Sequence, residues 1–331
     1  MILHPAVIAN VVASLIITGV LVYAGYYGIQ ILRKWDLRSG DEFQLILERR
    51  TYLISTILTF VCGLELMSLF LYVFTANNLC PLFVGAMCAA GTLNVNPYGY
   101  PTLLLKIVSF LFAGLWLILN HADNQAYDYP LIKKKYLLLT LIVPFSVLET
   151  SLQGAFFLNL KANVITSCCG SLFSSEQVKG VGSELAALPI KPMMWIFYLG
   201  MGVTLLSGIY FYLKGKGGYL YSTITFVMFG VSIASIISFI SIYIYELPTH
   251  HCPFCIVMEE YGYIGYVLYL PLFGAVVTGM GIGVLMPFRG VDSLRAVIPR
   301  LIKKLTLTSL TLYAAFTAIV VYKIATSNLI L

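Results

Sequence analysis

Charged residues are scarce in this sequence. Only 10% of its 331 residues are Asp, Glu, Lys or Arg, whereas a soluble domain carries roughly 25%. Hydrophobic residues make up 60%, and the mean hydropathy is +0.90. This composition excludes an ordinary soluble protein and predicts an integral membrane protein that lies in a lipid bilayer. The net charge of +6 is therefore interpreted as a signal of membrane topology and not of nucleic-acid binding.

Several motifs are also absent from the sequence. It contains no phosphate-binding loop and no Rossmann fingerprint, so nothing predicts ATP-driven transport. No Lys or Arg precedes the first apolar run, and Arg33 and Lys34 follow it. This pattern predicts a first membrane helix with its N-terminus outside, and not a cleavable signal peptide. Cys252 and Cys255 form a Cys-x-x-C pair, but Ile256 follows them where a c-type haem site requires histidine. The pair is therefore not a haem attachment site.

Long apolar runs, in contrast, are frequent. A helix needs about 20 apolar residues to cross the bilayer core. Eight segments satisfy this requirement, at about 6–32, 52–75, 102–121, 136–158, 192–213, 219–246, 256–286 and 305–326. We therefore predict an all-α fold, a polytopic membrane helix bundle of about eight transmembrane helices.

The basic residues indicate the orientation of these helices. If the N-terminus lies outside, the four inside loops hold 15 Lys and Arg residues and the three outside loops hold 3. This distribution obeys the positive-inside rule. It predicts that both termini lie outside, in the periplasm if the chain lies in a bacterial inner membrane.

The chain is predicted to form a single membrane domain over residues 1–331 with a parallel four-helix repeat. The two halves, 1–160 and 190–331, are joined by an outside loop. In both halves, the second and third helices are connected by an outside loop that contains Cys-Pro and later Tyr-Gly-Tyr. Parallel repeats of this kind are common in transporters.

Six of the seven cysteines lie in the predicted outside loops, where an oxidising compartment permits disulfide chemistry. The exception is Cys62, which we expect to pack inside the second helix as an ordinary buried residue. The other six form three pairs: Cys80 with Cys88, Cys168 with Cys169, and Cys252 with Cys255.

The third pair lies in the stretch THHCPFC. Pro253 is typical of a first helical turn, so we expect Cys252 at the N-terminus of the seventh helix. A helix N-terminus stabilises a thiolate, and positive charge on His250 and His251 would add to this effect. The pattern favours a redox-active pair, with a metal site or a structural disulfide as alternatives.

Glu259 and Glu260 follow Cys255 by about one helical turn. They are candidate acceptors for its proton, with a position in the lipid headgroup zone as the alternative. Cys80 and Cys88 have seven residues between them, which fits either a structural disulfide or a pair that shuttles electrons. Cys168 and Cys169 are adjacent and can bond to each other only through a strained ring. They are better suited to exchange with other thiols, to a soft metal such as Cu(I) or Hg(II), or to structural disulfides with other partners.

Two acidic residues fall inside predicted membrane helices. Glu65 and Glu149 each lie about 14 residues into a helix of the same direction, so we expect them at similar depth. Acidic groups within the membrane indicate function, here quinone chemistry or the passage of protons or cations. The alternative is a protonated side chain that bonds to a neighbouring helix. We expect Lys106, near a helix end, to extend to the membrane surface.

The C-x7-C pair in one loop, together with Cys-x-x-C at the outer end of a later helix, resembles the vitamin K epoxide reductase family. The quinone-linked disulfide-forming membrane enzymes follow a related logic. The resemblance implies that Cys80 and Cys88 relay electrons and that Cys252 and Cys255, next to a quinone, perform the redox chemistry. In that family, which is a four-helix bundle, about one helix lies between the two pairs, whereas four helices lie between them here.

These patterns predict a membrane thiol–disulfide oxidoreductase. Electrons would pass between a periplasmic thiol or disulfide protein and a membrane acceptor such as quinone. One alternative is a protein that binds or transports a soft metal through Cys168, Cys169, His250 and His251. A second alternative is a non-catalytic subunit of a respiratory or maturation complex, whose disulfides brace the outside loops.

Overall fold

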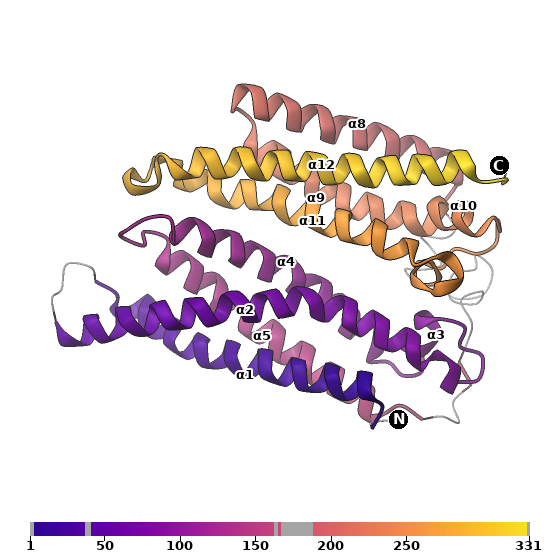
Figure 1. The fold of residues 1–331 in the computed structure, drawn as a ribbon, viewed down its shortest axis with the longest axis horizontal. Coiled ribbons are helices and arrows are strands. Elements are labelled where there is room, and N and C mark those ends of the chain that lie inside the picture. The colour runs from indigo at the N-terminus through magenta and orange to yellow at the C-terminus, as the bar shows by residue number, and fades with distance from the viewer. Residues whose placement is uncertain (1–2, 37–40, 162–164, 167–187, 330–331) are drawn as a thin grey trace. The chain divides into compact units, whose positions relative to one another are not determined.

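A computed structural model describes residues 3–36, 41–161, 165–166 and 188–329, and these residues form helices, turns and loops (Figure 1). The part of the chain so described contains eight helices that are long and apolar enough to cross a membrane. This confirms the prediction of an all-α polytopic membrane bundle. The helices form because an apolar chain in lipid must satisfy its backbone hydrogen bonds internally.

The helices belong to two compact units. Helix unit 1 comprises Met1–Thr75, Asn96–Lys161 and Phe288–Pro299, and helix unit 2 comprises Ala76–Val95, Ala162–Pro287 and Arg300–Leu331. The segment Ala76–Val95 therefore belongs to helix unit 2, although helices of unit 1 flank it in the sequence. This assignment brings Cys80 and Cys88 into the same unit as Cys252 and Cys255.

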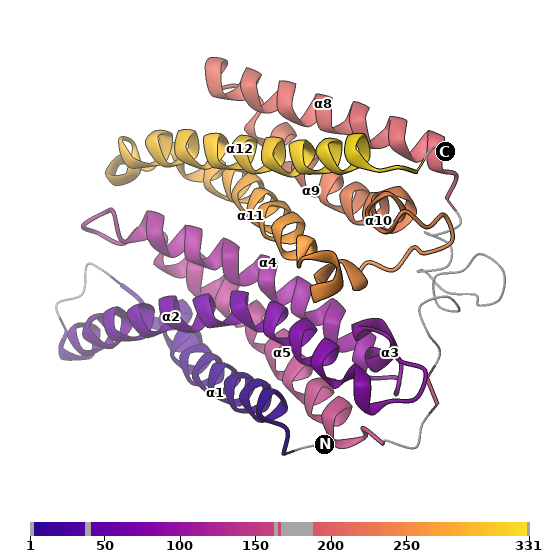
Figure 2. The ribbon, with the colours of Figure 1, turned by 45° about the vertical axis from the view of Figure 1, so that its right-hand side comes forward.

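Helix unit 1 contains four long helices. They are α1 (Pro5–Lys34), α2 (Glu42–Leu79, up to Thr75), α4 (Gly99–Asp123) and α5 (Ile132–Leu158). α5 packs against both α1 and α4, as Figures 1 and 2 show. Gly25 permits the close approach of α1 to α5, because a Cβ atom at residue 25 would lie 2.8 Å from Cγ2 of Val143 on α5. Small residues bring helix backbones together in this way in membranes.

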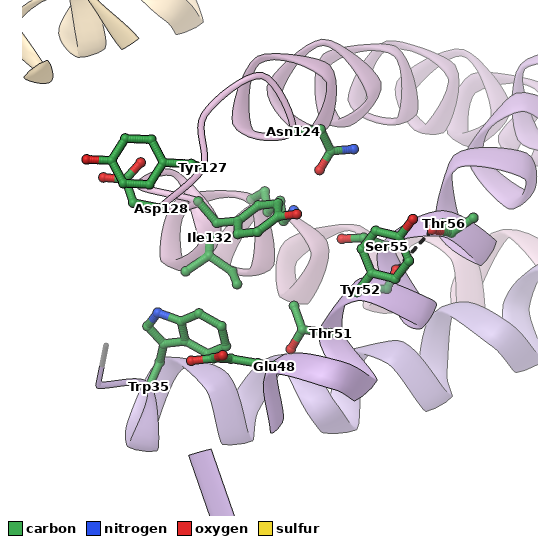
Figure 3. A pocket seen from close by; sticks show the side chains of 12 residues that line it. Trp35, Glu48, Thr51, Tyr52, Ser55, Thr56, Asn124, Tyr127, Asp128 and Ile132 are labelled. Carbon is green, nitrogen blue, oxygen red and sulfur yellow. Dashed lines mark hydrogen bonds between the residues drawn. The ribbon is translucent and has the colours of Figure 1, made fainter. Parts of the chain in front are cut away.

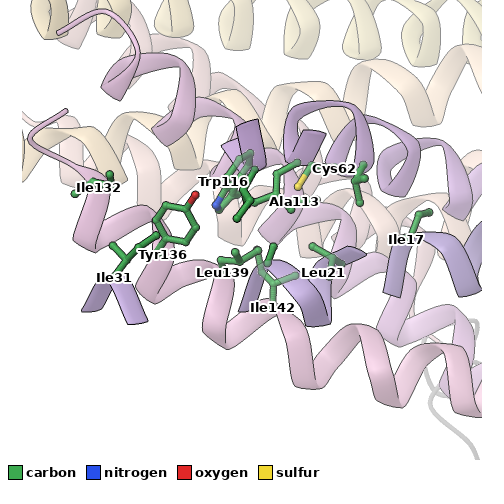
Figure 4. Packing of buried hydrophobic residues seen from close by; sticks show 14 of the residues in the cluster. Ile17, Leu21, Ile31, Cys62, Ala113, Trp116, Ile132, Tyr136, Leu139 and Ile142 are labelled. Atoms are coloured by element: carbon green, nitrogen blue, oxygen red, sulfur yellow. The ribbon is translucent and has the colours of Figure 1, made fainter. Parts of the chain in front are cut away.

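The core of helix unit 1 is apolar and aromatic (Figure 4). Trp116 and Tyr136 are completely buried in it, with Leu139 and Ile142 beside them. Cys62 is buried in the same cluster, which confirms its expected packing role.

Helix unit 2 contains four membrane-spanning stretches. They are α8 (Ile190–Lys214), α9 (Gly218–Ser235) with its continuation, α11 (Ile264–Leu285) and α12 (Val297–Thr326, from Arg300). α9 packs against α8 and α11. At Gly279 a Cβ atom would lie 2.6 Å from Thr225 Oγ1, so glycine is needed where α11 meets α9.

The close helix contacts described above involve different spans in the two units. α5 packs against α1 and α4 in helix unit 1, and α9 packs against α8 and α11 in helix unit 2. The parallel repeat and the outside position of the termini stay predictions.

The sixth span contains an irregular turn. α9 continues through η2 (Ile236–Ile240), a π-helical turn, into α10 (Ser241–Tyr245). The hydroxyl of Ser241 donates to the carbonyl of Ile236 at 2.6 Å within this turn. Inserted π turns of this kind are frequent near functional sites.

The start of the seventh span corrects a prediction. We expected this helix to begin near residue 256, with Cys252 at its N-terminus, but α11 begins at Ile264. Gly262 and Tyr263 have φ values of 61° and 55°, a left-handed conformation that interrupts a right-handed helix. Cys252 therefore receives no stabilisation from the dipole of α11.

Candidate functional site: a buried cluster of thiol groups

Three cysteines of helix unit 2 meet in one buried cluster. The Sγ atoms of Cys88, Cys252 and Cys255 all lie within 4.8 Å of one another. Cys88 Sγ and Cys252 Sγ are 3.5 Å apart. Cys88 and Cys252 are 0% exposed and Cys255 is 5% exposed. We call these three residues the thiol cluster.

Cys88 reaches the cluster from the loop between α2 and α4. Its backbone is extended, and the short helix α3 (Ala89–Leu93) follows it directly. The preceding turn requires Gly85, whose φ is 87° and whose Cβ position would lie 2.3 Å from the carbonyl oxygen of Thr166. Thr166 fastens this loop, since its N–H donates to Val84 O at 3.0 Å and its hydroxyl donates to Gly91 O at 2.8 Å.

Cys252 and Cys255 reach the cluster from the loop between α10 and α11. Two tyrosines of the flanking helices hold this loop. The hydroxyl of Tyr245 donates to the carbonyl of Cys252, and the hydroxyl of Tyr269 donates to the carbonyl of Pro253 at 2.7 Å. The backbone N–H of Phe254 also donates to Cys252 Sγ at 3.4 Å, a hydrogen bond that favours the thiolate form of Cys252.

His250 is a base that contacts the cluster. Its Nε2 atom lies 3.4 Å from Cys255 Sγ, and its ring packs edge-on against Tyr245 at a centroid distance of 4.5 Å. Burial lowers the pKa of His250, and a thiolate at Cys88 opposes this effect. We expected a positive charge here. The lowered pKa instead favours a neutral imidazole at pH 7, which suits a proton acceptor better than a fixed cation.

The other predicted residues of this region have different environments. Nδ1 of His251 donates to the carbonyl of Ile237 in the π-helical turn at 2.9 Å. Cys80 is buried at the start of η1 (Cys80–Leu82) and does not belong to the thiol cluster. Glu259 is exposed in η4 (Glu259–Tyr261), so its role as a proton acceptor stays a prediction. Cys168 and Cys169 lie outside the described residues.

The two acidic residues predicted within the membrane are both buried in helix unit 1. Glu65 is 4% exposed and Glu149 is 2% exposed, and they interact electrostatically with each other and with Lys106. Lys106 corrects a prediction, because it does not extend to the surface. It donates to Glu149 Oε1 at 2.7 Å and to Ser68 Oγ at 3.1 Å, and these two acceptors make its burial tolerable.

A second buried ion pair in helix unit 1 was not predicted from the sequence. Lys135 Nζ lies 2.7 Å from Asp123 Oδ2 and donates to Asn120 Oδ1 at 3.0 Å. The other oxygen of Asp123 accepts from the Leu131 N–H at 2.8 Å. The charges of Asp123 and Lys135 are evident from the sequence, but a charge alone cannot distinguish a buried pair from an exposed one.

Lys135 also lines a cavity of about 160 Å³ (Figure 3). Trp35, Tyr52 and Tyr127 supply aromatic walls, and Glu48 and Asp128 supply carboxylates. Trp35 Nε1 and Asp128 Oδ1 are buried without a hydrogen-bond partner among the described residues. A polar cavity of this size accommodates water molecules, which would satisfy these two atoms.

Comparison with protein-family models, with curated proteins and with solved structures finds no match to this chain. The fold and the site therefore define the class of this protein by themselves. It is a polytopic membrane helix bundle with a buried cluster of three thiol groups in one helix unit and a buried Lys–Glu–Glu group in the other.

Proposed function

We propose that this protein is a membrane thiol–disulfide oxidoreductase in which Cys88 exchanges electrons with the pair Cys252 and Cys255. The observation that carries the proposal is the 3.5 Å distance between Cys88 Sγ and Cys252 Sγ. A disulfide bond is about 2.05 Å long, so a movement of about 1.5 Å would convert this contact into a mixed disulfide.

The exchange begins with Cys252 and Cys255 joined by a disulfide. The Cys88 thiolate attacks Cys252 Sγ, the bond between Cys252 and Cys255 breaks, and Cys255 leaves as a thiolate. A second thiolate, from Cys80 or from a periplasmic thiol protein, attacks Cys88 Sγ and releases the Cys252 thiolate. Cys88 and the attacking sulfur are then joined by a disulfide, which a second thiol of a periplasmic donor protein resolves, and two electrons have passed to the pair.

A quinone is the acceptor that this proposal names. The reduced pair gives it two electrons and two protons, so that quinol forms and the Cys252–Cys255 disulfide closes again. His250 supports this step, because a neutral imidazole 3.4 Å from Cys255 Sγ can take the thiol proton. The reverse direction of electron flow uses the same contacts.

The proposed electron transfer takes place on the outer side of the membrane. The loops that carry the thiol cluster would face the periplasm of a bacterial inner membrane, since the Lys and Arg residues concentrate in the opposite loops. The resemblance to the vitamin K epoxide reductase family supports the same assignment, with Cys80 and Cys88 as the relay pair. Cys168 and Cys169 would offer a further point of exchange.

A quinone reduction assay on the full chain in lipid nanodiscs tests the proposal. The protein is first reduced and then mixed with a water-soluble quinone. Quinol formation is followed by absorbance and thiol loss by alkylation and mass spectrometry. We expect turnover in the wild type and in the matched control Cys62→Ser, and background rates in Cys252→Ser. Equal rates in Cys62→Ser and Cys252→Ser would overturn the proposal.

A second variant tests the role of Cys88. In Cys255→Ser the thiol that resolves the mixed disulfide is missing, so mild oxidation should accumulate a Cys88–Cys252 bond. Peptide mapping without reductant detects this bond directly. If the six cysteines of the predicted outside loops instead form disulfides in the wild type that resist mild reductant, a bracing role in a larger membrane complex becomes the better account.

Soft-metal binding is the second candidate, and the compactness of the thiol cluster favours it. Three Sγ atoms within 4.8 Å of one another, with an imidazole beside Cys255, form a donor set suited to Cu(I) or Hg(II) and also to Zn²⁺. Metal analysis of reduced protein, with Cys88→Ser as the comparison, tests it. One bound equivalent that disappears in Cys88→Ser would favour this function over electron transfer.

A further inference from the structure

Helix unit 1 buries two carboxyl groups beside one ammonium group. Lys106 on α4 contacts Glu149 on α5 at 2.7 Å, and their side chains are 0% and 3% exposed. Glu65 on α2 interacts with both of them and is 4% exposed. Three helices thus contribute one charged residue each to a single site.

The charges of this site do not balance. If both carboxyl groups were ionised, one negative charge would be left without a counter-ion. A charge buried in a low-dielectric interior is costly, and a buried group without a counter-ion becomes neutral instead. One of the two carboxyl groups must therefore be neutralised, by a proton or by another cation, for the site to be electrically neutral.

Among the described residues of helix unit 1, Lys106 is the one basic side chain that acts on the two carboxyl groups. Facing groups on α2 are the thiol of Cys62 and the phenol of Tyr72, whose ring lies 5.5 Å from Lys106 Nζ. The charged side chains of α1 lie only in its last turn, at Arg33 and Lys34. The missing positive charge must therefore be a proton or another bound cation.

Two oxygen atoms of the site are free to hold that proton. Glu65 Oε1 and Glu149 Oε2 are buried, and neither has a hydrogen-bond partner among the described residues. A buried acceptor without a partner is costly, whereas a carboxylic O–H shared between the two groups would satisfy both. The two unpaired oxygen atoms are evidence independent of the charge count, and they indicate the same two carboxyl groups as the place of the proton.

The second ion pair of helix unit 1 provides an internal comparison. Lys135 faces one carboxylate, Asp123, at 2.7 Å, and the remaining hydrogen bonds come from Asn120 and the Leu131 N–H. This pair is neutral when both groups are ionised and needs no proton. The Lys135–Asp123 pair has no excess carboxyl group, whereas the site around Lys106 has one.

We propose that Glu65 and Glu149 share one exchangeable proton beside Lys106, so that helix unit 1 contains a proton-binding site within the membrane. The site binds the proton as a neutral acid and releases it to leave a carboxylate. This function concerns helix unit 1 alone and does not depend on the proposed thiol chemistry.

Infrared spectroscopy of the full chain in lipid nanodiscs tests the proposal, because a protonated carboxyl group has its own C=O stretching band. We expect one such group per chain near pH 7, reversible loss of its band at higher pH, and a band shift in D₂O. Glu65→Gln and Glu149→Gln should each abolish the band, since one carboxylate then pairs with Lys106. Asp123→Asn should leave it unchanged.

A fourth variant tests the charge count itself. Lys106→Met removes the cation, so both carboxyl groups must then be neutral and the band should about double. The proposal is overturned if the wild type has no band that Glu65→Gln removes, or if the band neither titrates nor exchanges with D₂O. It is also overturned if added Na⁺ removes the band at constant pH, because the site would then bind a metal cation.

Discussion

Replacing Lys106 with methionine is expected to destabilise the protein by an amount that depends on pH. The substitution keeps the length of the buried side chain but removes the charge that pairs with Glu149 at 2.7 Å. A buried ion pair that loses one partner typically costs 3–5 kcal/mol. The buried carboxylate can reduce this cost by taking up a proton.

The cost of that proton sets the expected magnitude. A glutamate in water has a pKa of about 4.3, and each pH unit above it adds about 1.36 kcal/mol to the cost of protonation. This amounts to about 3.7 kcal/mol at pH 7 and about 1.6 kcal/mol at pH 5.5. The folded variant binds one proton more than the folded wild type, so its unfolding free energy should rise, relative to the wild type, as pH falls.

Unfolding in mixed micelles, titrated with a denaturing detergent and followed by tryptophan fluorescence, measures this difference at both pH values. Lys133→Met is the matched control, because Lys133 is exposed on the same helix as Glu149 and should cost little at either pH. A loss in Lys106→Met that stays the same between pH 7 and pH 5.5 would refute the charge-balance reasoning.

Three further predictions concern single side chains. Gly85→Ala should destabilise helix unit 2 by about 1–3 kcal/mol, because φ is 87° and the new Cβ would meet Thr166 O. Gly19→Ala, with open space around it, should not destabilise the protein. Thermal unfolding of the two variants measures the difference. Asp123→Asn should cost about 3–5 kcal/mol by leaving Lys135 buried without its counter-ion, measured by the same titration; an effect below about 1 kcal/mol contradicts the buried pair. Because burial lowers the pKa of His250, the unfolded chain takes up its proton first, so stability should fall as pH drops below about 6.5. His250→Gln should remove that part of the pH dependence, His121→Gln should not, and identical curves for both variants would contradict it.

The fold class could be predicted from the sequence, because it depends on local composition. A run of about 20 apolar residues must form a helix in lipid whatever its neighbours are, and all eight predicted spans are present. The packing role of Cys62 follows from the same information. Helix ends were less predictable, since the start of α11 depends on left-handed residues at Gly262 and Tyr263.

Only the tertiary structure decided which side chains meet. Cys88 and Cys252 are 164 positions apart in the chain, and their spacing in the sequence contains no information about the 3.5 Å between them. The cysteines were identifiable as candidates by residue type, but the exclusion of Cys80 from the cluster depends on how two distant loops fold together. A charge in the sequence likewise indicates topology, whereas its burial requires a partner on another helix. Lys106 and Lys135 each found such a partner on a neighbouring helix, and for that physical reason the sequence alone predicted neither buried pair.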